Sequence, residues 1–213
     1  MTTDEGVTKF ELAFEPSAAL PAHQLRALIA WRADLWRRGL IGQNDARYGG
    51  AGFGNVSQRL LSSTDVAEPR FAISGTQTGA LARIDARHFA IVTASFPERN
   101  RIEAEGPIAP SSESLTHAML YRLKPTIRFV FHVHSPDIWR RARGLRLPCT
   151  ADDVAYGTPA MALEMQRLLR AGVLAHRRLL VMGGHEDGVI AFGRTADQAG
   201  AALLQTLAAA KSF

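Results

Sequence analysis

The stretch Thr126–Ser135, TIRFVFHVHS, constrains the fold of this chain more than any other. Its period of two predicts a buried β-strand. One face of that strand is apolar and comprises Ile127, Phe129, Phe131 and Val133. His132 and His134 share the other face, about 6–7 Å apart at a rise of roughly 3.3 Å per residue. Buried imidazoles need partners for their ring nitrogens, so the pair is either hydrogen-bonded in the core or, as we expect, bound to one metal ion.

A catalytic metal site usually takes three protein ligands and leaves one position open. His185 is the best third candidate, because it lies in the turn GGHEDG, where small residues allow close backbone approach. Glu186 and Asp187 are alternative ligands or bases, or solvated turn residues. His117, on the preceding helix, can support the ligands from behind. We expect a divalent ion and favour Zn²⁺, although imidazoles also accept Mn²⁺ and Co²⁺.

Glu113 lies in the first turn of a helix that the sequence PSSE opens. One interpretation is an acid that interacts with the positive helix end, worth about 0.5 kcal/mol. The other is a general base that takes a proton from the carbon next to a metal-bound carbonyl. The ion then stabilises the resulting enediolate as a Lewis acid. Spacing alone does not separate the two interpretations.

Three short polar segments are candidates for binding a phosphate: Gly54–Ser57, Ser74–Gly79 and Ser111–Ser112. Backbone amides in glycine turns and at helix N-termini favour anions. Each segment alone says little, because turns of Gly, Ser and Thr are common. Together with the histidine pair, they indicate a small anionic substrate.

The remaining pattern predicts a weakly structured lead-in over residues 1–20 and a single domain over 21–213. We expect helices over 22–39, 110–123, 136–143, 159–171 and 195–210. Further strands are expected over 56–61, 71–74, 88–93, 101–105, 179–182 and 189–192. No steady alternation of strand and helix is present, which favours an α/β fold with a mostly antiparallel mixed sheet covered by helices.

Composition narrows the class of function. The 213 residues are 46% hydrophobic and carry a net charge of +5, from scattered arginines rather than a dense basic run. We therefore expect no nucleic-acid partner. The single cysteine, Cys149, forms no intramolecular disulfide and suits a reducing cytoplasm. We expect neither a signal peptide nor a membrane span, which needs about 20 apolar residues.

These motifs, in this order from about Leu25 to Leu207, resemble the class II aldolase/adducin family, the group around fuculose-phosphate aldolase and ribulose-phosphate 4-epimerase. The specific part is PSSE followed about twenty residues later by H-x-H. The resemblance implies a three-layer α/β/α fold, with His132, His134 and His185 as metal ligands and Glu113 as the catalytic acid/base. The phosphate-binding positions that it implies are Asn55, Thr78, Gly79, Ser111 and Ser112, with Ser74 and Gly75 as an alternative to Thr78 and Gly79.

The activity implied is that of a metal-dependent aldolase-type lyase, which forms or cleaves a C–C bond next to a ketone in a sugar-phosphate-like substrate of carbohydrate metabolism. The assembly implied is a homotetramer with its sites at subunit interfaces. Alternatives within the family are an epimerase and a dehydratase. Glu rather than Asp at position 113 argues against the epimerase. Another is a non-catalytic adducin-like binding module, against which the retained histidines argue.

The chain departs from the family pattern at two places. The third histidine is normally followed by glycine, but here Glu186 and Asp187 precede Gly188, so an alignment on that glycine makes Asp187 the third ligand. The resemblance implies proton-donating tyrosines after His134 and in a longer C-terminal tail, and we expect this chain to lack both stretches. Tyr48 and Tyr156 are the nearest substitutes.

Overall fold

An eight-stranded sheet forms the centre of the computed structural model, which describes residues 6–60, 68–174 and 177–213. The strand order is β1-β7-β6-β5-β4-β8-β10-β9. The strands are β1 (Glu11–Pro16), β4 (Asn55–Arg59), β5 (Phe71–Ser74), β6 (Phe89–Phe96), β7 (Arg101–Gly106), β8 (Phe129–His134), β9 (Leu179–Val181) and β10 (Gly188–Gly193). Neighbours pair antiparallel, apart from β1, which runs parallel to β7. The mostly antiparallel mixed sheet is thus confirmed.

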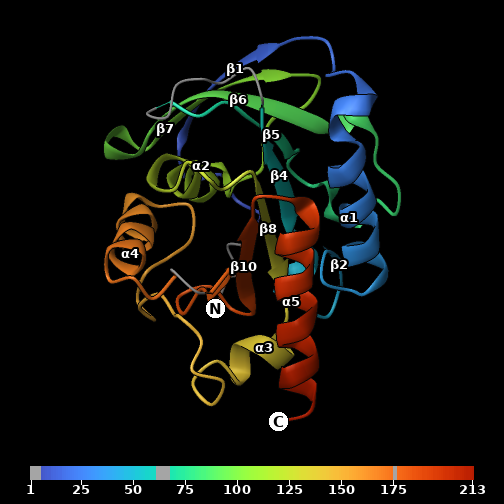
Figure 1. The fold of residues 1–213 in the computed structure, drawn as a ribbon. Coiled ribbons are helices and arrows are strands. Elements are labelled where there is room, and N and C mark those ends of the chain that lie inside the picture. The colour runs from blue at the N-terminus through green and yellow to red at the C-terminus, as the bar shows by residue number, and fades with distance from the viewer. Residues whose placement is uncertain (1–5, 61–67, 175–176) are drawn as a thin grey trace.

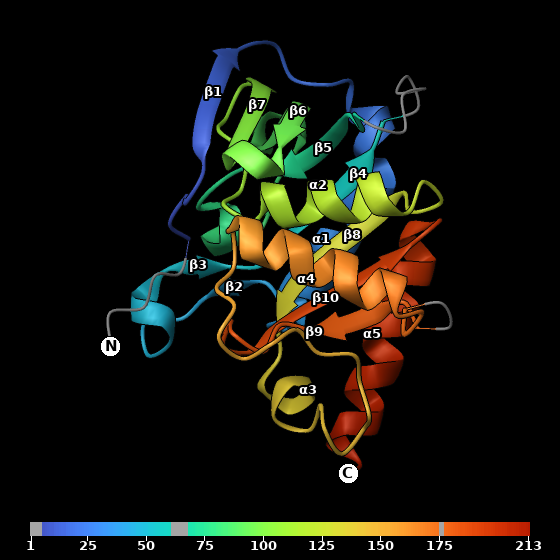
Figure 2. The same cartoon turned by 90° about the vertical axis from the view of Figure 1, so that its left-hand side faces the viewer.

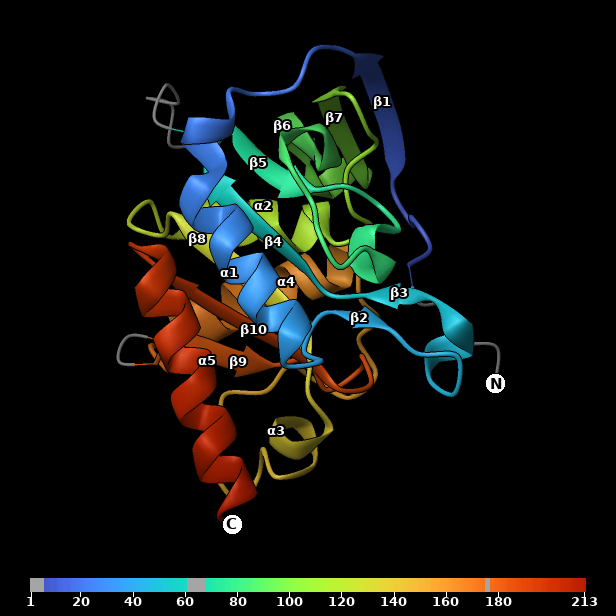
Figure 3. The same cartoon turned by 90° about the vertical axis from the view of Figure 1, so that its right-hand side faces the viewer.

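Helices cover both faces of this sheet. They are α1 (Arg26–Arg37), α2 (Ser114–Leu123), α3 (Pro136–Arg140), α4 (Pro159–Arg170) and α5 (Ala196–Lys211). Figure 2 shows α2 and α4 in front of one face, and Figure 3 shows α1 and α5 in front of the other. Two hydrophobic cores result, one on each side of the sheet. The predicted three-layer α/β/α architecture is confirmed.

The histidine strand β8 separates these two cores. Phe131 and Val133 belong to the core beneath α1 and α5, whereas His132 and His134 project from the opposite face. Ile127 lies in the core with α2 and α4, so its predicted place beside Phe131 is wrong. It precedes the first residue of β8, and the two-residue period holds only within a strand.

Strand β1 lies inside the stretch predicted as a weakly structured lead-in, and that prediction is wrong for Glu11–Pro16. Phe10 is buried and the alternate residues Leu12 and Phe14 pack against the same core, so the segment has the period of a half-buried strand. The first five residues of the lead-in lie outside the described residues, as does Leu61 at the end of a predicted strand.

The other predicted helices and strands are present, some of them with shifted ends. β5 has its predicted bounds, β6 continues to Phe96, and α3 ends at Arg140 instead of 143. A two-stranded sheet of β2 (Gly42–Gln43) and β3 (Gly52–Phe53) lies beside the turn Thr78–Ala80. Figure 1 shows β2 next to α1, and Figure 3 shows β2 and β3 side by side. Among the described residues no helix is long and apolar enough to span a bilayer.

Candidate metal centre

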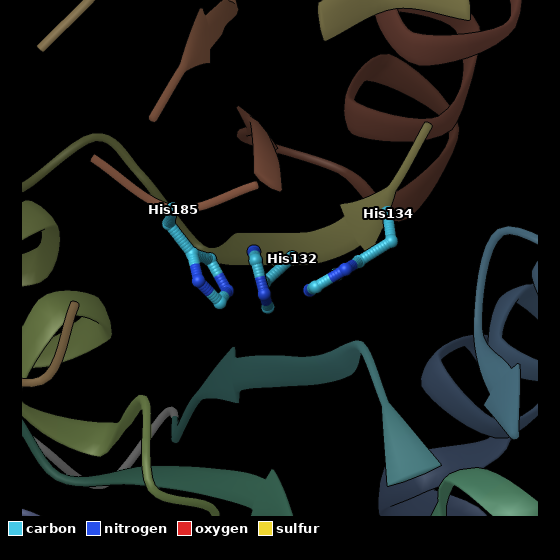
Figure 4. Close-up of side chains that lie close together, drawn as sticks. All are labelled: His132, His134 and His185. Carbon is cyan, nitrogen blue, oxygen red and sulfur yellow. The ribbon is translucent and has the colours of Figure 1, made fainter. Parts of the chain in front are cut away.

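Three histidines converge on one point. β8 supplies His132 and His134, and the turn between β9 and β10 supplies His185. One nitrogen from each ring lies within 4.8 Å of the others, and Figure 4 shows the rings pointing towards one common space. The antiparallel register of β10 on β8, with Gly188 opposite His134, brings the turn to this place.

The donor set fits a divalent metal ion. His132 is 1% exposed, and neither of its ring nitrogens has a hydrogen-bond partner among the described residues. Such orphaned buried nitrogens are costly unless something else satisfies them. Burial lowers the pKa of His132 to about 4 and those of His134 and His185 well below their usual value. The rings are therefore neutral at physiological pH, the form that binds metals.

The geometry favours His185 over Asp187 as the third ligand. The Asp187 carboxylate accepts hydrogen bonds from the Tyr48 hydroxyl at 2.6 Å and from the Arg47 guanidinium at 2.8 Å. Asp187 has a left-handed backbone with φ of 62°, and its carboxylate is not among the ligand atoms that converge. Glu186 is exposed. The inserted pair thus extends the turn without displacing the histidine.

Glu113 lies beside the cluster, at the N-cap of α2. Its Oε1 is 3.8 Å from Nε2 of His185, and its side chain is almost fully buried. Burial raises the pKa of Glu113 to about 7, against smaller opposing effects of the Thr116 hydroxyl and the Lys9 charge. A buried carboxyl that titrates near neutral pH suits a general base better than a helix cap.

The predicted supporting residue, His117, is fully buried behind the cluster. Its Nδ1 lies 2.7 Å from the hydroxyl oxygen of Ser57, which lies 2.7 Å from the Tyr121 hydroxyl. Burial, with a smaller effect of the His132 charge, lowers the pKa of His117 well below its usual value. His117 is not among the three ring donors that converge.

Six of the seven predicted anion-binding residues line one small polar pocket: Asn55, Gly75, Thr78, Gly79, Ser111 and Ser112. Ser74 does not line it, because its hydroxyl accepts a hydrogen bond from the Val56 N–H at 3.1 Å. Asn55 on β4 pairs with His132 on β8, so the pocket adjoins the metal centre. The pocket also has close-packed walls, since a Cβ on Gly79 would lie 2.6 Å from the Gly42 carbonyl oxygen.

Both candidate tyrosines contact metal-centre histidines. The Tyr48 ring lies 4.6 Å from that of His134, and the Tyr156 ring lies 4.4 Å from that of His185, centroid to centroid. Sequence reasoning missed two nearby cations: Arg47, which forms an ion pair with Asp187, and Lys9, whose ammonium lies over the Tyr156 ring. The position of Arg47 next to Tyr48 is the one signal that could have found it. Lys9 gave no signal, because it lies in the stretch predicted as a lead-in.

Known proteins resemble this chain in sequence and in fold. Residues 43–212 match the model of the class II aldolase and adducin N-terminal domain. L-fuculose-1-phosphate aldolase from Thermus thermophilus has a similar structure, with a TM-score of 0.65 and 20% identity over 90% of this chain and 93% of that one. A sugar-phosphate aldolase from Thermotoga maritima gives a TM-score of 0.66 and 14% identity, covering 89% and 93%.

One sequence relative is a methylthioribulose-1-phosphate dehydratase from Stenotrophomonas maltophilia, 32% identical over 102 residues. The match covers 42% of this chain and 47% of the relative, about half its length. The structural likenesses show the fold, and the family model spans most of the chain, including the histidines and Glu113. The chain belongs to the class II aldolase and adducin family.

Proposed function

We propose that this chain is a metal-dependent aldolase-type lyase, which forms or cleaves a C–C bond next to a ketone in a small sugar-phosphate-like substrate. The observation that carries the proposal is the buried Glu113 carboxyl, 3.8 Å from a ring nitrogen of the three-histidine cluster. Such a carboxyl can move a proton at the carbon next to a carbonyl.

The residues have separate roles in this proposal. His132, His134 and His185 hold a divalent ion, for which Zn²⁺ is the favoured candidate. The bound ion supplies Lewis-acid stabilisation of the negative charge that proton removal leaves on the substrate oxygens. Glu113 accepts that proton and returns it, helped by a pKa that burial raises to about 7.

The polar pocket binds the phosphate of the substrate. Its lining offers backbone N–H groups of a glycine-rich turn together with the side chains of Asn55, Thr78, Ser111 and Ser112. No acidic side chain is among the described lining residues, so nothing there repels an anion. Because Asn55 pairs with His132, a substrate of a few carbons spans the distance from pocket to cluster.

Two further proposals rest on the family resemblance and on composition. We propose a homotetramer with its sites at subunit interfaces, which light scattering on the purified protein tests. A cytoplasmic location fits the single cysteine, Cys149, which is free and partly buried.

A dehydratase is the second candidate, favoured by the 32% identity to a protein of that name. In the direction of C–C bond formation, an aldolase begins as a dehydratase does, with removal of a proton next to the carbonyl. The next step differs, because the dehydratase breaks a C–O bond and expels water, whereas the aldolase forms a C–C bond to an aldehyde. An adducin-like binding module needs neither the histidine cluster nor a carboxyl beside it.

Proton exchange tests the shared first step. Zinc-loaded protein is incubated with dihydroxyacetone phosphate in D₂O, and loss of the α-proton signal is followed by NMR. We expect exchange that EDTA abolishes and that Glu113→Gln slows by about 10²–10⁴-fold, the usual contribution of a general base. Exchange that persists in Glu113→Gln contradicts the assigned base, and absence of stoichiometric metal contradicts the enzyme proposal.

Product analysis then separates the two candidates. A panel of ketose 1-phosphates is incubated with the protein. Release of dihydroxyacetone phosphate and an aldehyde identifies an aldolase. A diketo product one water lighter, without chain cleavage, identifies a dehydratase.

A further inference from the structure

The segment Gly6–Phe10, here called the N-terminal strap, precedes β1 and lies outside the region that matches the family model. Figures 2 and 3 both show the chain before β1 running from the start of that strand towards β3. Its course takes it past the anion pocket and the metal centre.

The strap is held in place along its backbone. The Asn100 side-chain amide donates to the Lys9 carbonyl oxygen at 2.6 Å, and the Glu11 N–H donates to the Asn100 carbonyl oxygen at 2.8 Å. Phe10 is buried in the core with α2 and α4. The backbone at Lys9 is therefore held by Asn100 and by the burial of Phe10.

One end of the strap closes the anion pocket. Gly6 is among the lining residues, with a left-handed φ of 74°. A Cβ at this position would lie 2.8 Å from Nε2 of Gln77 and 3.8 Å from the Gly52 carbonyl oxygen. The strap thus runs beside the pocket turn, with a backbone conformation at Gly6 that favours glycine.

The other end of the strap carries a cation to the metal centre. Nζ of Lys9 lies 4.0 Å from the centroid of the Tyr156 ring, which packs on the ring of His185. A Cβ on Gly157 would lie 3.9 Å from Cβ of Lys9 and 3.2 Å from the Ser112 carbonyl oxygen. The Lys9 side chain therefore starts beside the wall of the anion pocket and ends beside the metal centre.

The positive charge of Lys9 lies beside the metal centre, over the Tyr156 ring that packs on His185. No lysine or arginine is among the described residues that line the pocket, and Arg47 is held by Asp187. Lys9 supplies a positive charge that these surroundings lack.

We propose that the N-terminal strap completes the active site, and that the Lys9 ammonium binds an anionic oxygen of the substrate other than its phosphate. This inference rests on the proposed function. It narrows the substrate class to phosphorylated compounds that carry, or develop during reaction, a second negative charge within a few carbons of the phosphate.

Two simple anions separate the roles of pocket and strap. Inorganic phosphate probes the pocket alone, and phosphoglycolate adds a carboxylate two bonds from the phosphate oxygen. Calorimetric titration of zinc-loaded protein measures both dissociation constants in wild type, Lys9→Met and Lys9→Arg. Lys211→Met is the matched control, because Lys211 is an exposed lysine at the end of α5.

We expect wild type to bind phosphoglycolate more tightly than phosphate. Lys9→Met should weaken the binding of phosphoglycolate by about tenfold or more, which is the worth of one charged hydrogen bond. The dissociation constant of phosphate should stay within about threefold of the wild-type value. Lys9→Arg should recover most of the loss, and Lys211→Met should change neither anion. Zinc content and melting temperature establish that each variant is folded and loaded.

The outcomes that overturn the inference differ from those that overturn the proposed function. Equal effects of Lys9→Met on both anions, or no effect on either, overturn the role of Lys9. If wild-type protein binds zinc but neither anion, the anion pocket and with it the proposed function fail.

Discussion

At the scale of single residues, His185 and Asp187 show how neighbours in one turn take different partners. The carboxylate of Asp187 accepts hydrogen bonds from Tyr48 and Arg47, while the ring of His185 converges with the two histidines of β8. Burial and the nearby Asp187 raise the pKa of Tyr48, so its hydroxyl stays protonated and donates. Asp187 thus stabilises the turn, and His185 completes the candidate metal centre.

Substitution of His185 should therefore affect zinc binding, and substitution of Asp187 should affect stability. His185→Ala removes a ligand and should lower zinc affinity by more than about 100-fold, since loss of an outer partner alone costs 10–100-fold. Asp187→Asn should retain one zinc per chain and lower the free energy of unfolding by about 1–2 kcal/mol, because Arg47 is partly exposed. Competition with a chromophoric chelator and urea unfolding measure the two effects. Loss of zinc only in Asp187→Asn would make Asp187 the ligand.

Buried titratable groups give the metal-free protein a pH dependence with two opposing parts. Burial lowers the pKa of His132 to about 4, so the unfolded state binds more protons below pH 6.5 and acid destabilises the fold. Burial raises the pKa of Glu113 to about 7, so the folded state holds a proton between about pH 4.5 and 7 and acid stabilises the fold there.

Replacing Glu113 should leave only the pH dependence of stability that the buried histidines cause. In metal-free Glu113→Gln, the free energy of unfolding should fall more steeply from pH 7 to pH 5 than in wild type, by up to about 1.4 kcal/mol per pH unit. Urea unfolding in EDTA at several pH values measures the slopes. If the free energy of unfolding of the variant falls with pH no more steeply than that of wild type, the pKa of Glu113 is not raised.

At the scale of elements, periodicity found β8 because its side chains alternate between the two faces of the sheet, and the sequence PSSE marked the start of α2. The failures of periodicity have physical causes. β1 was missed because Phe10, Leu12 and Phe14 alternate over only a short run that ends at Pro16. β2 and β3 have two residues each, too few to show a period. The three histidines were found as residues, but their convergence depends on strand register, which local sequence does not encode.

A helix also holds the pocket turn in a way that sequence did not reveal. The buried guanidinium of Arg32 on α1 donates to the carbonyl oxygens of Thr78, at 2.6 Å, and of Gly79 and Leu81. Burial lowers its pKa to about 10, so Arg32 stays charged. With their carbonyls tied to α1, the peptide groups of this turn keep one orientation at the pocket wall.

Arg32→Met should therefore loosen the turn. We expect inorganic phosphate to bind about tenfold more weakly and the free energy of unfolding to fall by about 2 kcal/mol, the scale of charged hydrogen bonds lost. Zinc affinity should stay within about threefold, because Arg32 contacts no histidine of the cluster. Titration calorimetry on zinc-loaded protein tests this. Unchanged phosphate affinity would leave Arg32 a purely structural role.

At the scale of the whole molecule, the site is assembled from segments far apart in sequence. β4 brings Asn55, the start of α2 brings Glu113, β8 brings two histidines, and the β9–β10 turn brings the third. Motif order predicted which residues take part, and the shared sheet explains why they meet. The contribution of the N-terminal strap was not predictable, because its contacts follow from the parallel pairing of β1 with β7.

Metal removal should consequently affect the stability of the whole fold. A bound ion ties β8 to the β9–β10 turn, and an ion present at 100 times its dissociation constant adds about 2.7 kcal/mol to folding. For a chain of this length, roughly 2–4 °C per kcal/mol predicts that EDTA lowers the melting temperature by about 5–10 °C. Differential scanning fluorimetry with EDTA, and then with added zinc, measures the loss and its recovery.

His132→Ala provides the matched control for this experiment. This variant lacks one ligand, so its melting temperature should not respond to EDTA or zinc, whereas a variant at the exposed Lys211 should respond as wild type does. The two variants distinguish zinc in the histidine cluster from zinc bound elsewhere on the surface. An equal zinc response in His132→Ala and wild type would mean that the three histidines do not hold the ion. The buried ring nitrogens of His132 would then need another partner.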